Sequence, residues 1–260
     1  MGAVNPVSLD IVWVLVATVL VFLMQAGFAL LESGAARAKN SINIIMKNVM
    51  DMSIGSLAFW LVGFGLMFGA NESGWIGTNN FGLSEIDPAS ETGMNDYAFF
   101  IFQTVFAATA ATIISGAVAE RLKFFSYVII TFITSGIIYP LVGHWIWAFD
   151  FSNPDRKFGW LGKLGFIDFA GASVVHSVGG WVALSILLIV GPRTGRFRND
   201  DAKGNKTFQG SNTPMAALGA LILWFGWFGF NGGANLAMDI RIPLILINTF
   251  MAASAGLISS

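Results

Sequence analysis

The chain has 260 residues, of which 55% are hydrophobic and only 11% are charged. Soluble domains carry about a quarter charged residues, so this composition excludes a soluble domain and indicates an integral membrane protein. The formal net charge of -1 says little, because the charges are confined to segments between apolar runs. The chain contains no cysteine, which excludes a disulfide framework, a thiolate nucleophile and a thiolate metal site.

Apolar runs that are long enough, or nearly so, to cross a bilayer as helices recur along the whole chain. They cover residues 10–31, 43–69, 97–118, 125–149, 168–190, 214–231 and 242–260. The first ten residues lack Lys and Arg, so the first run is expected to be a retained span and not a signal peptide. In the second run, Lys47 and Asp51 favour an interfacial first turn. The pattern predicts an all-α, polytopic membrane helix bundle.

Positive charges alternate between the connections of these runs. The first, third and fifth connections hold Arg37, Lys39, Lys47, Arg121, Lys123, Arg193, Arg196, Arg198, Lys203 and Lys206, and the even ones hold only Arg156, Lys157, Lys163 and Arg241. Basic connections stay in the cytoplasm, so the N-terminus is expected outside. The connection over 70–96 is acidic and has no positive charge. It is either a solvated loop or a surface that mildly enriches cations.

The fifth run begins at Asp168 and places a histidine, His176, near its middle. An ionisable side chain inside a membrane span is a functional candidate. Ala172, His176 and Gly180 recur at spacing four, so they share one face of a helix. That face either packs closely on another helix or lines a narrow lumen. A carboxylate at the start of the run can cap free N–H groups, so the role of Asp168 can be purely structural.

The predicted orientation brings several aromatic side chains to the outer side of the membrane. They are Phe102 and Phe106 in the third run, Trp147 in the fourth and Phe230 in the sixth, beside Asp168. Packing explains the phenylalanines equally well, and an interfacial belt explains Trp147. A cation on ring faces gains roughly 0.5 to 2 kcal/mol per contact, which can select a small cation. His176 lies deeper, where a neutral imidazole can exchange hydrogen bonds with an uncharged polar solute.

Five segments, in this order along the chain, together resemble the ammonium transporter (Amt/Rh) family. They are residues 25–34 (QAGFALLESG), 102–106 (FQTVF), 116–121 (GAVAER), 168–171 (DFAG) with His176, and 226–233 (GWFGFNGG). The resemblance implies a trimer of eleven-helix subunits, each with a narrow apolar pore between two inverted five-helix halves. A short echo between residues 25–34 and 227–236 fits such an inverted repeat. Residues 1–260 then form one transporter domain, the N-terminal part of a longer protein with seven of the eleven helices.

The resemblance also implies a role for each candidate residue. Trp147 is expected to wall an outer cation site, Phe106 and Phe230 to form a stacked gate below it, and Phe102 to lie beside that gate. Asp168 corresponds to a buried carboxylate that supports the site, and His176 to the first of two pore histidines.

Residue 234 departs from the family pattern. Many members have a serine three residues after the Asn of the Phe-Asn motif, and its hydroxyl completes the outer site; here that position is Ala234. A hydrogen bond to a charged group contributes roughly 1.5 to 3 kcal/mol, so recruitment of the cation is expected to be about tenfold weaker or more, unless water or another side chain substitutes.

We therefore expect a multi-pass cell-membrane protein, with the N-terminus outside, that passes ammonium or ammonia through its pore. The alternative is an ammonium sensor on the same scaffold, fused to a C-terminal signalling module. One buried histidine without a placed nucleophile or a Cys/His metal cluster argues against an enzyme. The expected partners are ammonium or ammonia, the lipid bilayer, two further subunits of a homotrimer and a cytoplasmic regulatory or signalling partner. No cofactor, metal or nucleic acid is expected.

Overall fold

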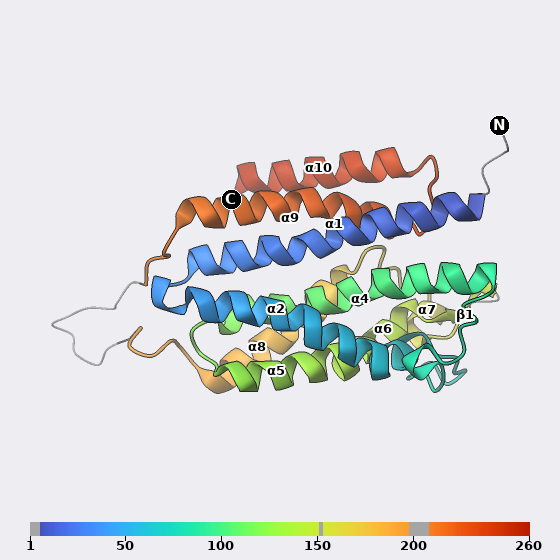
Figure 1. The fold of residues 1–260 in the computed structure, drawn as a ribbon, viewed down its shortest axis with the longest axis horizontal. Coiled ribbons are helices and arrows are strands. Elements are labelled where there is room, and N and C mark those ends of the chain that lie inside the picture. Colours follow the sequence, from blue (N-terminus) through green and yellow to red (C-terminus); the bar gives the residue numbers. More distant parts are fainter. Residues whose placement is uncertain (1–5, 151–152, 198–207) are drawn as a thin grey trace.

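The computed structural model describes residues 6–150, 153–197 and 208–260, and it confirms the predicted helical bundle. Seven helices are long and apolar enough to cross a membrane. Their bounds are α1 (Pro6–Ala35), α2 (Ser41–Ala58) continued by α3 (Phe64–Phe68), α4 (Glu91–Val118), α5 (Phe124–Ile133) continued by α6 (Tyr139–Trp147), α8 (Val178–Val190), α9 (Thr213–Gly233) and α10 (Ile242–Ser259). They lie side by side along the long axis of the molecule (Figure 1).

Three of the spans contain a wider, π-helical turn. These turns cover Phe59–Gly63 between α2 and α3, Thr134–Ile138 between α5 and α6, and Ala172–Ser177 before α8. Such turns inside helices are frequent at functional sites. The one at Ala172–Ser177 includes His176.

The remaining elements are short. Two 3₁₀ turns cover Ala38–Asn40 and Phe81–Leu83, and α7 covers Trp160–Lys163. The strands β1 (Phe149–Asp150) and β2 (Asn153–Lys157) pair antiparallel, with Phe149 opposite Lys157. Figure 1 places β1 and α7 at the end of the bundle where α1 begins.

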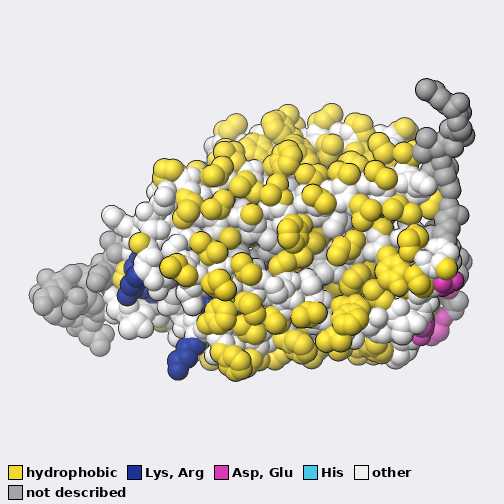
Figure 2. All heavy atoms as spheres, viewed as in Figure 1, with side chains coloured by type: hydrophobic (Ala, Val, Ile, Leu, Met, Phe, Trp, Pro, Cys, Tyr) yellow, Lys and Arg dark blue, Asp and Glu magenta, His cyan; other side chains and the backbone are white. Residues whose placement is uncertain are grey.

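The two ends of the bundle carry opposite charges. In Figure 2 apolar side chains cover the long side, Lys and Arg gather at one end, and Asp and Glu gather at the other. The basic end is where α1 meets α2 and where α4 meets α5; the acidic end holds the connection between α3 and α4. A wide apolar band between two charged caps is the surface of a protein in a bilayer.

The central helix is α4. Among the described helices, α1 and α9 make the most extensive contact with each other. In the most apolar 18-residue stretch of α4, 83% is buried, against 39% or less in the corresponding stretches of the other spans. The close approach of α1 and α9 requires glycine, because a Cβ on Gly219 would lie 2.4 Å from the backbone nitrogen of Leu31. Small residues at such crossings let two membrane helices pack backbone to backbone.

The structure corrects the interpretation of Lys47 and Asp51 as an interfacial first turn. Both side chains lie inside the bundle, with 1% and 0% of the residue exposed. Asp51 accepts hydrogen bonds from the hydroxyls of Tyr127, at 2.5 Å, and Thr131, at 3.0 Å. Lys47 donates to the carbonyl of Leu122 at 3.4 Å and lies over the Tyr127 ring. Hydropathy could not show that these charges have partners on α5, which is distant in sequence.

Glu32, in the segment 25–34, joins three helices in the same part of the bundle. Its Oε2 accepts from Asn48 of α2 at 3.2 Å and from Ser115 of α4 at 2.7 Å. Asn48 in turn accepts from Thr112 at 2.8 Å. Because buried polar groups must be paired in an apolar surrounding, this network fixes α1, α2 and α4 against one another.

Candidate functional site

Asp168 caps the start of the fifth span from four residues outside it. Its Oδ1 accepts from the backbone N–H groups of Gly171 (2.8 Å) and Ala172 (3.0 Å), and its Oδ2 from Ser173 (2.9 Å) and Val174 (2.8 Å). Gly171 has φ of +96°, a conformation that glycine adopts without strain. The span therefore begins at Ala172, four residues after the start of the predicted run, and the predicted capping by the Asp168 carboxylate is confirmed. The half-buried carboxylate serves as an N-cap for the free N–H groups of this helix end.

The same turn fixes the indole of Trp147. Its Nε1 donates to the backbone carbonyl of Asp168 at 2.6 Å. Trp147 is the last residue of α6, and its ring centroid lies 6.3 Å from that of Phe106, at 61°. Asp168 thus orders the helix start through its carboxylate and orients Trp147 through its carbonyl.

A cavity of about 310 Å³ lies between the end of α6, the turn at Asp168 and one face of α4. We name it the outer cavity, after the end of the bundle that is expected to face outside. Of the predicted site residues, it brings together Phe102, Phe106, Trp147, Asp168 and Ala234. Most of the residues that line this cavity are aromatic or aliphatic, beside Gln103, Lys157 and Asp168. Such a site suits a small cation, because ring faces are electron-rich.

Phe106 and Phe230 form a parallel stack, with centroids 4.1 Å apart and planes 12° apart. Phe102 contacts Phe106 from the side, at 4.6 Å. Each of the three residues is 1% exposed. On the far side of the stack, the His176 ring meets Phe230 edge to face at 5.5 Å. The rings follow one another from Trp147 to Phe106, Phe230 and His176.

A second cavity, of about 570 Å³, begins beyond the stack. It is lined by His176, Phe230 and Asn231, and by residues of α10 that include Thr249. The outer cavity borders Phe106 and the second borders Phe230, so the stacked pair lies between them, and Asp168 and Phe169 line both cavities. His176 Nδ1 lies 3.2 Å from the carbonyl of Gly171.

The helical face with Ala172, His176 and Gly180 is exposed along its length in the described part of the chain. His176 therefore lines an open cavity here, and neither close helix packing nor an enclosed lumen surrounds it. A Cβ added at Gly180 would meet no atom within 4 Å.

Sequence reasoning missed several side chains of the outer cavity. Phe68, Phe149 and Lys157 also line it, with the Lys157 ammonium 5.5 Å from the Phe149 ring centroid. Phe99, which recurs at helical spacing with Phe102 and Phe106, lines it too. Gln103 lines it as well. Gln103 precedes Phe106 by three residues and so shares its helical face, but spacing alone does not show that this face borders a cavity.

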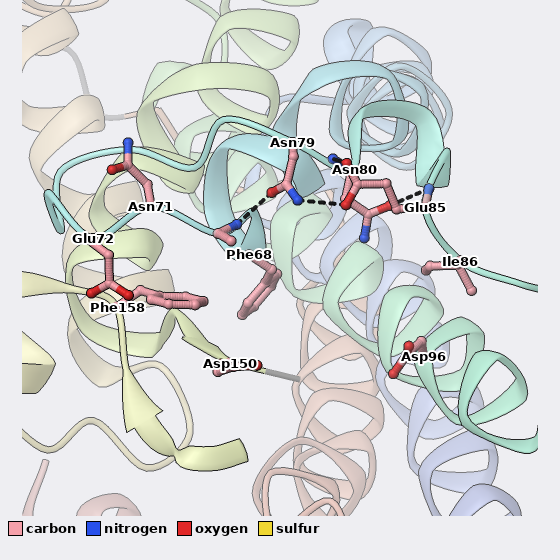
Figure 3. Close-up of a pocket in the computed structure, with 11 residues that line it drawn as sticks. Phe68, Asn71, Glu72, Asn79, Asn80, Glu85, Ile86, Asp96, Asp150 and Phe158 are labelled. Carbon is pink, nitrogen blue, oxygen red and sulfur yellow. Dashed lines mark hydrogen bonds between the residues drawn. The ribbon is translucent and has the colours of Figure 1, made fainter. Parts of the chain in front are cut away.

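A third cavity, of about 650 Å³, lies at the acidic end and shares Phe68 with the outer cavity (Figure 3). Its lining includes the carboxylates of Glu72, Glu85 and Asp96. Asn79 donates to Glu85 at 2.6 Å, so the acidic connection is held by bonds of its own. The third cavity thus lies beside the outer cavity, at the acidic connection.

Comparison with known proteins places this geometry in a family. The model of the Ammonium Transporter Family matches residues 12–260. Ammonium transporter Amt2 of Archaeoglobus fulgidus is 44% identical over 262 residues, covering 98% of this chain and 54% of the relative. Ammonium transporter 1 member 3 of Solanum lycopersicum is 43% identical over 238 residues, covering 91% and 50%. The chain spans about half the length of the curated relatives it matches.

Solved structures agree with these relatives. A structure titled "Sensor Amt Protein" is 45% identical with a TM-score of 0.88, covering 96% of this chain and 60% of that one. Mep2 of Candida albicans is 31% identical with a TM-score of 0.80, covering 95% and 52%. The sequence similarity, the shared helical fold and the match over residues 12–260 lead to one conclusion: this chain belongs to the Ammonium Transporter Family.

Proposed function

We propose that the protein to which this chain belongs transports ammonium across the membrane, by binding the cation in the outer cavity and passing ammonia to His176. The observation that carries the proposal is the Phe106 and Phe230 stack between two cavities, with a tryptophan on one side and a histidine on the other. Family membership and the names of the relatives support the substrate.

The division of the path follows from solvation. Ring faces attract a cation in the outer cavity, where water still reaches it. Between the stacked rings an ammonium ion would lose its hydration, which costs several kcal/mol that a single imidazole cannot replace. A neutral ammonia molecule avoids that loss. The proton therefore passes from the nitrogen to water in the outer cavity, at or before the stack, and His176 exchanges hydrogen bonds with the uncharged species.

The experiment is an assay of the full-length protein in liposomes, with transport and ligand-dependent signalling measured in parallel. Transport of ammonium or of a methylated analogue above that of empty liposomes supports the proposal. The variant Phe125→Ala is a control that should transport like the parent, because this side chain is 73% exposed on α5 and lines neither cavity. A protein that binds ammonium but passes none would overturn it.

A second candidate function is ammonium sensing. Two observations favour it: the likeness to the structure titled "Sensor Amt Protein", and alanine where many members have a serine hydroxyl. A weaker outer site lowers the throughput of the pore, and a receptor needs less flux than a transporter. Signalling that follows ammonium concentration in the absence of transport would select this function over the first.

We also propose a homotrimer in the cell membrane, with the N-terminus and the acidic end outside. The charge segregation of Figure 2 supports the orientation. The apolar side chains that the described chain leaves exposed on α1, α9 and α10 support contacts with lipid, further helices or other subunits. Native mass spectrometry of the full-length protein tests the trimer; a monomer or dimer as the main species would exclude it.

A further inference from the structure

The outer cavity is lined by a glutamine whose amide oxygen has no hydrogen-bond partner among the described residues. Gln103 lines this cavity, and only 6% of the residue is exposed. Its Oε1 is buried and has no hydrogen-bond partner among the described residues. A buried carbonyl oxygen without a partner is unfavourable, so a native structure retains one only where it meets water or a ligand. The position of Gln103 makes a cationic ligand the natural partner.

Helix geometry places Gln103 within the aromatic wall. It lies four residues after Phe99 and three before Phe106, and both of these also line the cavity. Side chains on a helix lean toward its N-terminus, so the amide lies about one turn nearer the acidic end than the Phe106 ring. A cation resting on Phe106 therefore meets the amide before it reaches the stack.

Among the described side chains that line this cavity, Asp168 is the other one with acceptor oxygens. Both oxygens of Asp168 accept two backbone N–H groups each, and its carbonyl accepts from Trp147. Ala234 has no side-chain acceptor. Ring faces attract a cation whether or not it has N–H groups, whereas a carbonyl oxygen forms a hydrogen bond only with a cation that has an N–H donor directed at it.

We propose that the Gln103 amide oxygen accepts a hydrogen bond from ammonium in the outer cavity, and so supplies the acceptor that Ala234 does not. The inference rests on the proposed function, because it names a further residue of the same site. It makes Gln103 a specificity-determining residue that favours cations with N–H donors.

The test compares ammonium binding to the full-length protein and three variants by calorimetric titration. Gln103→Leu and Gln103→Met keep the bulk and remove the oxygen, and both are expected to weaken binding about tenfold, the effect of one charge-assisted hydrogen bond. Gln103→Glu keeps an acceptor of the same length and is expected to bind at least as tightly as the parent. Thr104→Val is the control, because this buried hydroxyl bonds to its own helix at Phe100 and does not line the cavity.

The outcomes separate this inference from the function on which it rests. If Gln103→Leu binds ammonium like the parent, or if Gln103→Glu loses as much affinity as Gln103→Leu, the amide oxygen is not an acceptor and the inference is overturned. Trp147→Leu is titrated in the same experiment, as a variant that is expected to weaken binding by the loss of a ring contact and not of the Gln103 oxygen. If neither the parent nor any variant binds ammonium, the proposed function fails and the inference falls with it.

Discussion

Ala234 is the residue whose replacement tests the outer site most simply. It lines the outer cavity at the end of α9, where a serine hydroxyl would add an acceptor for a second N–H of ammonium. We expect Ala234→Ser to tighten ammonium binding about tenfold, as one charge-assisted hydrogen bond allows. Calorimetric titration checks this, with Ala255→Ser, exposed on α10, as the control. An unchanged or weaker affinity would mean that Ala234 merely packs here.

Glu120 is a second residue with a measurable consequence, at the basic end and outside the spans. Its side chain is 0% exposed, and Oε1 accepts from Arg37 Nε at 2.9 Å and Asn40 at 2.6 Å. Burial acts to raise the pKa of this carboxyl, but the hydrogen bonds from Arg37 and Asn40, with the Arg193 charge 3.3 Å from Oε2, lower it below its usual 4.5. The ionised form is thus the one that the fold stabilises.

The sign of the pH effect follows from this depressed pKa. The stabilisation by Glu120 is fully present above the unfolded-state pKa near 4.5 and is lost as pH falls through the lower folded-state value. We expect Glu120→Gln to lower the unfolding free energy by about 1.5–3 kcal/mol at neutral pH, and the difference from the parent to shrink in acid. Thermal unfolding across pH checks it against Glu72→Gln, whose exposed ion pair contributes little. A difference that grows in acid would contradict the assignment.

The crossing of α1 and α9 is the element contact on which the site depends, because α9 carries Phe230. A Cβ at Gly219 would meet backbone atoms of α1 at 2.4 and 2.6 Å, whereas a Cβ at Gly256 of α10 would meet nothing within 4 Å. We expect Gly219→Ala to destabilise the protein by about 1–3 kcal/mol, although alanine is the better helix former. Gly256→Ala should be neutral or slightly stabilising. Equal melting temperatures for the two variants would show that α1 and α9 do not pack this closely.

The elements themselves could be predicted from the sequence to within a few residues, because twenty apolar residues in a row have few alternatives in a bilayer. Position along a helix also placed Phe102, Phe106 and Trp147 toward the same end. What the sequence did not disclose are contacts between distant segments. The capping by Asp168 was predicted, but the left-handed Gly171 that moves the helix start to Ala172 was not. The burial of Lys47 and Asp51 needs partners at Leu122 and on α5.

Gln103 was missed for a related reason. A lone polar residue in an apolar helix can face a neighbour, a cavity or a backbone carbonyl, and spacing alone does not distinguish these. The roles assigned to the aromatic residues, Asp168 and His176 stay predictions, although the structure places their side chains in one connected arrangement.

At the scale of the whole molecule, the charge segregation predicts which end faces the cytoplasm. Because the chain has no cysteine, a single introduced one reports its side of the membrane. We expect Ala89→Cys, exposed in the acidic connection, to react with an impermeant maleimide on intact cells. Thr194→Cys, exposed at the basic end, should react only after permeabilisation. The reverse pattern would place the N-terminus inside.

In the proposed function, the Phe106 and Phe230 stack divides two roles: ammonium binds on the side of Trp147, and ammonia passes on the side of His176. The most direct measurement compares Trp147→Leu with His176→Ala in the full-length protein, by ammonium titration and by flux of methylated ammonium into liposomes. We predict that Trp147→Leu weakens binding several-fold, by the loss of one ring contact, and that His176→Ala binds like the parent and changes flux. Equal loss of binding in the two variants would contradict the account.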